Sequence, residues 1–421
     1  MPWRELSWRR RLAITAGCTA PGLLVRLTGS GVPYPAQVLF YGASVVAASF
    51  LLAWACEAAQ VDVAHGLVVA VVAFVAILPE FIVEVHFAFT GQAEYVTANL
   101  TGASRLLLGC AVALPAAISL LPARRRPSLG ELALPEPHRI ELVVLSLGAL
   151  WSMRGVLSGH VDVFDSAVLI GLYVLYLHQA AAAGGEAPEP MGISAELAVL
   201  DRGERHRWVA WLMGYAGFVI LVTAVPFGDA VLGAGTLVGV SPYLLLQWIV
   251  PVATETPELV VASVLLLHGR GGQSIAVLLA GAVSQYTLAL GTLPLAYAVG
   301  VASGPLPLAG RERIELLLTV GVALYAVAAL VRLRLSRGDS SIMLVLFAGQ
   351  LLIPTVFTRF VFAVVFWAVA IDVLVSERRE IRALFTGPRA ATPSGRRGRG
   401  PRGRSRTPSP AEAAGTRSPR P

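Results

Sequence analysis

The chain has 421 residues, of which 56% are hydrophobic and 14% charged, and its mean hydropathy is +0.69. These values exclude an ordinary soluble globular domain and are typical of a protein that crosses the membrane several times. The formal net charge of +7 does not describe the membrane body, because the segment after Ser376 is rich in arginine. Its last part, 387–421, consists mainly of Pro, Gly, Ser and Arg, so we expect a disordered tail and no nucleic-acid partner.

Apolar segments follow one another along the chain, and most are near the roughly 20 residues that a helix needs to cross a bilayer. They cover residues 11–28, 36–60, 63–89, 94–121, 139–157, 161–180, 207–228, 239–267, 273–301, 312–331, 340–357 and 359–376. Their apolar runs lack the alternation of an outer-membrane barrel. The sequence therefore predicts an all-α polytopic membrane protein, with the lipid bilayer as its main partner.

Arginine clusters between the segments predict the orientation. They are Arg9 to Arg11, Arg124 to Arg126, Arg202 to Arg207, Arg270, and Arg332 to Arg337. The positive-inside rule then places both termini in the cytoplasm of a multi-pass protein of the cell's inner (plasma) membrane. Segment 11–28 is either a retained helix or a signal peptide, and the lack of a clear cleavage site favours the retained helix.

Two segments place Pro-Glu inside an apolar run, once in each half of the chain. The first contains Pro79 and Glu80, and the second contains Pro257 and Glu258. Proline interrupts the helical hydrogen bonds, and a carboxylate in hydrocarbon is costly. With the predicted orientation the two helices run in opposite directions, as in the inverted repeats of many secondary transporters. The pattern predicts an ion site near the bilayer midplane.

More oxygen ligands surround these two glutamates. Glu84 shares a helix face with Glu80, and Glu255 shares one with Glu258. The helices that follow offer neutral oxygens from Asn99, Ser104, Ser284, Gln285 and Thr287. Hard oxygen ligands suit Ca²⁺, Na⁺ or protons. For the neutral residues other than Asn99, interhelical hydrogen bonding explains the pattern as well as ligation does.

Arg105 is unusual because it lies deep inside an apolar run. A buried guanidinium needs a partner, and the glutamates of the Pro-Glu segments are the obvious candidates. We therefore expect Arg105 to act as an internal counter-charge that neutralises one of these carboxylates and takes the place of one cation.

These motifs resemble those of the sodium/calcium exchanger superfamily of cation/calcium antiporters. That family carries a G-T-S-L-P-E element in each of two inverted five-helix repeats, followed by a G-N-x-x-G-S-N element. Here Leu78-Pro79-Glu80 and Pro257-Glu258 match the first element, while Asn99 and Gly102 match the second. The second repeat departs from it, because aligning Gln273 with Gln92 puts Ala280 opposite Asn99.

The resemblance implies a ten-helix exchanger core with extra helices at both ends. It makes Glu80 and Glu258 the paired cation (metal) ligands, with Asn99 and Thr254 among the neutral ones. The expected organisation is an N-terminal segment (1–35) with an extra helix, a first repeat (36–180), a cytoplasmic linker (181–206), a second repeat (207–357), an extra C-terminal helix (358–386) and the tail (387–421).

The sequence thus predicts a secondary antiporter, exchanging Ca²⁺ or Na⁺ for Na⁺ or H⁺ by alternating access. The cation is a substrate, and we expect no cofactor. A transporter-derived sensor or structural protein without ion flux is the alternative. We expect no enzymatic activity, because paired intramembrane aspartates, a His-x-x-x-His pattern and a Gly-rich nucleophile turn are all missing. The oligomeric state stays open.

Overall fold

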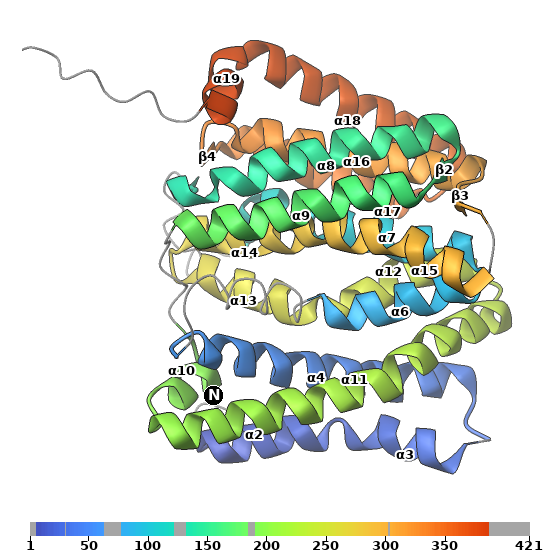
Figure 1. The fold of residues 1–421 in the computed structure, drawn as a ribbon, viewed down its shortest axis with the longest axis vertical. Coiled ribbons are helices and arrows are strands. Elements are labelled where there is room, and N and C mark those ends of the chain that lie inside the picture. Colours follow the sequence, from blue (N-terminus) through green and yellow to red (C-terminus); the bar gives the residue numbers. More distant parts are fainter. Residues whose placement is uncertain are drawn as a thin grey trace, which may run out of the picture.

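The computed structural model describes residues 6–29, 31–62, 77–121, 132–183, 190–301 and 304–386, and it is almost entirely helical (Figure 1). The N-terminal half contains α2 (Trp8–Gly17), α3 (Ala20–Thr28), α4 (Tyr34–Ala59), α6 (Leu78–Phe89), α7 (Ala93–Ser119), β1 (Leu132–Ala133), η2 (Glu136–His138), α8 (Arg139–Ser158), β2 (His160–Val161) and α9 (Val163–Ala183). Three predicted features lie outside the described residues. They are the cluster Arg124 to Arg126, residues 63–76 of segment 63–89, and the tail 387–421.

The C-terminal half begins with the short α10 (Ile193–Ala198). It continues with α11 (Arg202–Val238), α12 (Pro242–Thr254), α13 (Thr256–Leu267), α14 (Gly271–Ser284), the π-helical η3 (Gln285–Ala289), α15 (Leu290–Val301), β3 (Leu306–Pro307), α16 (Gly310–Leu330), β4 (Arg334–Leu335), α17 (Arg337–Leu352), α18 (Val356–Ser376) and α19 (Arg378–Thr386).

The helices are arranged in layers (Figure 1). Helices α2, α3, α4 and α11 form one outer layer, the shorter α6, α12 and α13 lie in the middle, and α7–α9 with α14–α18 form the rest of the bundle. Two ends can be distinguished. One carries the starts of α2, α8 and α11 together with β4 and α19, and we call it the arginine-rich end. The opposite end carries β2 and β3, and we call it the β2–β3 end.

The short strands reveal the inverted repeat. β1 precedes α8 and β2 follows it, while β3 precedes α16 and β4 follows it. β1 pairs with β4 and β2 pairs with β3, both antiparallel. Each strand of one half therefore pairs with the non-equivalent strand of the other half, at opposite ends of the bundle. This arrangement makes α8 equivalent to α16 and α9 equivalent to α17.

Helices α7 and α12 approach each other closely. A Cβ atom at Gly102 would lie 1.9 Å from the carbonyl oxygen of Gln247. No side chain fits at that distance, so glycine is what allows the two backbones to touch. This contact holds the broken α12–α13 segment against the helix that carries Asn99 and Arg105.

Within the described ranges, fewer continuous spans are found than the twelve apolar segments of the sequence, and segment 63–89 is only partly covered by these ranges. Among the described residues, eight helices are long and apolar enough to cross a membrane, or nine if α12 and α13 count as one broken span. Segment 11–28 is not one helix but two, because Pro21 has no N–H to continue the hydrogen bonds of α2. The two short helices pack on α4, where Ser44 Oγ accepts from the backbone N–H of Gly22 at 3.0 Å.

Other predicted segments keep their positions with changed limits. Segment 239–267 is broken into α12 and α13, and segments 340–357 and 359–376 correspond to α17 and α18. α17 ends at Leu352, just before Pro354, and α18 starts with a capping box at Thr355. The linker 181–206 contains α10, whose Ser194 hydroxyl donates to the Glu57 carboxylate at the end of α4.

Candidate functional site

Two helix starts bring the predicted carboxylates into the interior of the bundle. Pro79 lies in the first turn of α6, directly before Glu80. α12 and α13 meet at an angle of 58° around Glu255, and Pro257 lies in the first turn of α13. Both prolines therefore stand where the missing N–H breaks no intrahelical bond.

Glu80, Glu255 and Glu258 form one acidic cluster. Glu80 is 1% exposed and Glu255 is 3% exposed, while Glu258 is partly exposed. Glu255 interacts electrostatically with both other residues, and its carboxyl group lies next to that of Glu80. Within the described part of the chain, neither oxygen of Glu80 has a hydrogen bond of normal geometry. Carboxylates this close repel each other unless a cation or a proton lies between them.

Two amides face this acidic region. Asn99 Nδ2 donates to Glu84 Oε1 at 3.1 Å, and Gln285 Nε2 lies 3.5 Å from Glu255 Oε1. The oxygens of both amides, Asn99 Oδ1 and Gln285 Oε1, are buried and have no hydrogen-bond donor among the described residues. Each amide therefore orients one carboxylate and keeps its own oxygen available for a further ligand.

The two predicted hydroxyls differ in position. Thr254 lies beside Glu80, and its hydroxyl donates to the carbonyl oxygen of Val250 at 2.9 Å. Ser284 is 1% exposed and donates to the carbonyl oxygen of Ala280 at 3.2 Å. Both keep lone pairs. Thr254 lies at the acidic cluster itself, whereas Ser284 is connected to it through the next residue, Gln285.

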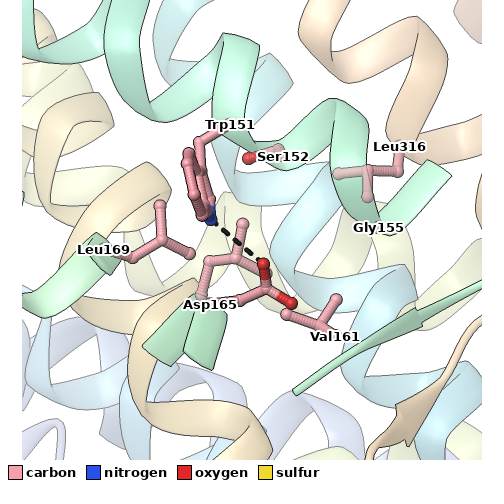
Figure 2. Close-up of a pocket in the computed structure, with 8 residues that line it drawn as sticks. Trp151, Ser152, Gly155, Val161, Asp165, Leu169 and Leu316 are labelled. Carbon is pink, nitrogen blue, oxygen red and sulfur yellow. Dashed lines mark hydrogen bonds between the residues drawn. The ribbon is translucent and has the colours of Figure 1, made fainter. Parts of the chain in front are cut away.

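The acidic cluster is open rather than a closed metal cage. Among the described residues, no three His, Cys, Asp or Glu side chains stand close enough together to enclose a metal ion. Gln285 lines one small pocket together with Ser104. Another pocket lies near β2, where Trp151 donates to Asp165 Oδ1 at 3.0 Å (Figure 2). None of the predicted cation ligands lines this second pocket.

Arg105 pairs with a residue other than the expected ones. It is fully buried, and its Nη2 lies 2.7 Å from Oε2 of Glu315 in α16. Its Nη1 donates to Gln350 Oε1 at 3.0 Å, and its Nε donates to the carbonyl oxygen of Thr101 at 2.9 Å. The expectation that a carboxylate of the Pro-Glu segments would be its partner was wrong, because the side chain extends toward α16 and α17 instead.

A second arginine shares the same carboxylate. Arg359, in α18, is 1% exposed, and its Nε lies 3.6 Å from Glu315 Oε1. Arg359 also donates to Gln350 at 3.1 Å and to Gln247 at 3.3 Å, and Gln247 donates to Glu315 at 3.1 Å. We call these residues, with Arg105, the Glu315 network. Its two guanidinium groups and one carboxylate leave one excess positive charge in a buried region.

Sequence reasoning missed Glu315 and Arg359, although a signal for the former was present. The run Arg-Ile-Glu-Leu occurs at 139–142 and again at 313–316, each time near the start of a helix that follows a short strand. Glu141 and Glu315 are therefore equivalent positions of the two repeats. Counted from β2 and β4, Tyr176 in α9 and Gln350 in α17 are equivalent as well.

Comparisons with known proteins agree with this architecture. The family model of the sodium/calcium exchanger protein matches residues 35–180 and 208–356. A crystal structure of the H⁺/Ca²⁺ exchanger CAX is 34% identical in sequence, covers 90% of this chain and 96% of its own, and superimposes with a TM-score of 0.83. A search of curated proteins returned no significant match.

More distant structures share the fold. The Ca²⁺/H⁺ antiporter protein YfkE is 13% identical, with 85% of this chain and 99% of its own covered and a TM-score of 0.58. The sodium-calcium exchanger NCX_Mj is 18% identical, with 81% and 99% covered and a TM-score of 0.50. With the match of the family model to both repeats and the similarity to CAX, these findings show that the chain is a membrane protein of the sodium/calcium exchanger family.

Proposed function

We propose that this protein is a secondary cation antiporter that exchanges Ca²⁺ for H⁺ by alternating access around the acidic cluster. Glu80, Glu255 and Glu258 bind either the divalent cation or protons, and the exchange of one for the other couples the two fluxes. Glu84, Asn99, Thr254, Gln285 and Ser284 complete the ligand set as the two halves rearrange. The cation is the transported substrate.

The observation that supports this proposal best is the pair of neighbouring buried carboxyl groups, Glu80 and Glu255, with both Glu80 oxygens unpartnered by the described residues. A divalent cation and protons are the two charges that relieve such a pair. The 34% identity to the H⁺/Ca²⁺ exchanger CAX favours H⁺ over Na⁺ as the counter-ion.

The alternative of a sensor without ion flux loses its main support. That alternative depended on Arg105 acting as a fixed cation in the carboxylate site, but Arg105 binds Glu315. A direct flux measurement separates the two functions.

For the orientation, we propose that the arginine-rich end faces the cytoplasm. In the described part of the chain, Arg139, Arg270, Arg332 and Arg378 stand at or beside helix ends that lie there (Figure 1). The positive-inside rule then puts both termini on the cytoplasmic side of the cell's inner membrane.

The test is transport by the purified protein in liposomes under gradients of Ca²⁺, Na⁺, K⁺ and pH. We expect Ca²⁺ uptake driven by an outwardly directed flux of H⁺, and its loss in the Glu80→Gln, Glu258→Gln double variant. Exchange driven by Na⁺ alone would reassign the counter-ion. Absence of cation flux under every gradient would reject antiport.

A further inference from the structure

The Arg-Ile-Glu-Leu copy at the arginine-rich end contains a buried carboxylate that the antiport site does not use. Glu141 is 4% exposed, and its Oε2 has no hydrogen-bond partner among the described residues. Its Oε1 lies 3.0 Å from His138 Nδ1. The His138 side chain is 32% exposed, so it links the buried carboxylate to the solvent at this end.

Three residues with hydroxyl groups, Tyr176, Tyr173 and Ser284, follow one another in a line from Glu141 toward the acidic cluster. The Tyr176 hydroxyl interacts with the Glu141 carboxylate, and the Tyr176 ring is 6.2 Å from that of Tyr173, one turn earlier in α9. The Tyr173 hydroxyl lies near Ser284 without forming a hydrogen bond of normal geometry. A small rotation or one water molecule closes such a gap.

The line ends beside the acidic cluster. Ser284 is the last residue of α14, and Gln285, which follows it, reaches Glu255 Oε1 at 3.5 Å. All members of the line between His138 and Gln285 are at least nine-tenths buried. Each can accept one proton while it releases another, because carboxyl and hydroxyl groups are both donors and acceptors.

The equivalent copy at the β2–β3 end cannot do this. There Glu315 faces Arg105 and Arg359, whose guanidinium groups are donors only and carry permanent charge. At the arginine-rich end, the charged or titratable neighbours of Glu141 are His138, Tyr176 and, on its own helical segment, Glu136 and Arg139. No arginine pairs with Glu141 among the described residues. The equivalent carboxylates thus have different surroundings. Glu315 is surrounded by groups that can only donate, whereas Glu141 has neighbours that can both accept and release a proton.

We infer that His138, Glu141, Tyr176, Tyr173 and Ser284 form a proton route from the arginine-rich end to the acidic cluster, which joins the cation site at Ser284. This inference rests on the proposed function, because only a proton-coupled exchanger needs such a route. A proton that enters at His138 passes from Nδ1 to Oε1 of Glu141, while the proton of the carboxyl group leaves from its other oxygen, Oε2, toward the Tyr176 hydroxyl. The tyrosine and serine hydroxyls then each take up one proton and release one, and a water molecule beside Gln285 carries the proton from Ser284 to the Glu255 carboxylate, so that no charge stays on the route.

The test uses two transport modes of the purified full-length protein in liposomes. Ca²⁺-driven H⁺ flux needs the proton route, whereas exchange of radioactive for unlabelled Ca²⁺ needs only the cation path. In the Glu141→Gln variant we expect H⁺ flux to fall by about a hundredfold, the scale on which a positioned proton-transfer group acts, and Ca²⁺/Ca²⁺ exchange to stay unchanged. Tyr176→Phe, which keeps the ring, should show the same separation.

Glu136→Gln is the matched control, because Glu136 is on the same helical segment and its side chain is 71% exposed. It should leave both modes unchanged. Loss of both modes together in Glu141→Gln and Tyr176→Phe would show a structural role and overturn the inference, and so would retention of both. If the unmodified protein itself exchanges no Ca²⁺ for H⁺, the proposed function is wrong, and this inference, which depends on it, is rejected as well.

Discussion

The two Arg-Ile-Glu-Leu copies occupy the same place in the two repeats and differ in what surrounds the glutamate. Glu315 is in contact with Arg105 and Arg359, and it accepts a hydrogen bond from Gln247. Glu141 has a histidine and a tyrosine as its neighbours. The comparison shows that the backbone of an inverted repeat can keep its symmetry while the charges that it buries do not.

Part of the difference arises from one pair of equivalent positions, while Arg359 is added by α18 after the second repeat. The alignment of Gln92 with Gln273 puts Tyr286 opposite Arg105, and the Tyr286 hydroxyl donates to the carbonyl oxygen of Thr319 at 2.5 Å. One repeat thus supplies a permanent charge where the other supplies a neutral phenol. The Glu315 copy therefore acts as a fixed connection between helices, whereas no arginine of the described residues holds the Glu141 carboxylate.

The largest expected effect comes from removing the shared carboxylate. Glu315→Gln leaves two buried guanidinium groups without a counter-charge, which should cost about 3–5 kcal/mol of stability. The equivalent change Glu141→Gln leaves no charge unpaired and should cost about 1 kcal/mol or less, the scale of one hydrogen bond. Thermal unfolding of both variants in the same detergent measures the contrast, and equal losses would contradict it.

A second contrast concerns glycines that lie where helices meet. At Gly102 an added Cβ would lie 1.9 Å from a backbone oxygen, whereas at Gly281 the nearest atom is a side-chain carbon of Leu107 at 3.1 Å. Gly102→Ala should therefore destabilise the protein by about 1–3 kcal/mol, because the α12 backbone must move. Gly281→Ala should cost less, since a leucine side chain can adjust.

Thermal unfolding of the two alanine variants, compared side by side, is the measurement. A Gly281→Ala variant that is the less stable of the two would show that α14, and not α12, makes the tighter contact with α7. Transport by Gly102→Ala should also fall, because α12 carries Thr254 and leads directly to Glu255.

A smaller effect is expected at the second arginine of the Glu315 network. Arg359→Met removes the excess positive charge and leaves Arg105 and Glu315 as a balanced pair. The change also removes the hydrogen bonds of Arg359 to Gln350 and Gln247 but leaves no charge unpaired, so the loss of stability should be about 1–2 kcal/mol, the scale of these hydrogen bonds. A loss as large as that of Glu315→Gln would mean that Arg359, and not Arg105, is the main partner of Glu315.

The sequence predicted the acidic cluster better than the network beside it. Proline and glutamate inside an apolar run identify Glu80 and Glu258 because each residue is costly there on its own. Their opposite directions could be inferred from the arginines between the segments. The structure confirms the fold and the family, while the ligand roles of these residues stay predictions for transport experiments.

The Glu315 network could not be found in the same way. Glu315 and Arg359 lie close to the ends of apolar segments, where charged side chains usually reach water. Only the packing of α16 against α18 and α7 turns them inward, and no local pattern states which distant helix covers a given face. The Arg105 prediction failed for this reason: the need for a carboxylate was correct, but the nearest motif did not supply it.

The smallest expected effect compares the caps of the two equivalent helices α9 and α17. After β2, Asp162 Oδ1 accepts from the backbone N–H of Asp165 at 3.1 Å, and after β4, Ser336 Oγ accepts from that of Asp339 at 3.0 Å. The group that accepts this hydrogen bond is a carboxylate in the first cap and an uncharged hydroxyl in the second. The hydrogen bond from Arg154 lowers the pKa of Asp162 from 3.8 to about 2.

A lowered pKa in the folded protein means that the ionised form is the one that folding favours. The contribution of Asp162 is therefore complete above pH 3.8 and disappears as the pH falls toward 2. The Asp162→Asn variant should be slightly less stable than the unmodified protein at pH 6, and the difference should shrink between pH 4 and pH 2. Ser336→Ala, at the equivalent cap, removes an uncharged capping group, so its loss should change less over this range. Unfolding midpoints of both variants across this pH series test the assignment, and a pH-independent difference for Asp162→Asn would place the cap's contribution in its hydrogen-bond geometry rather than in its charge.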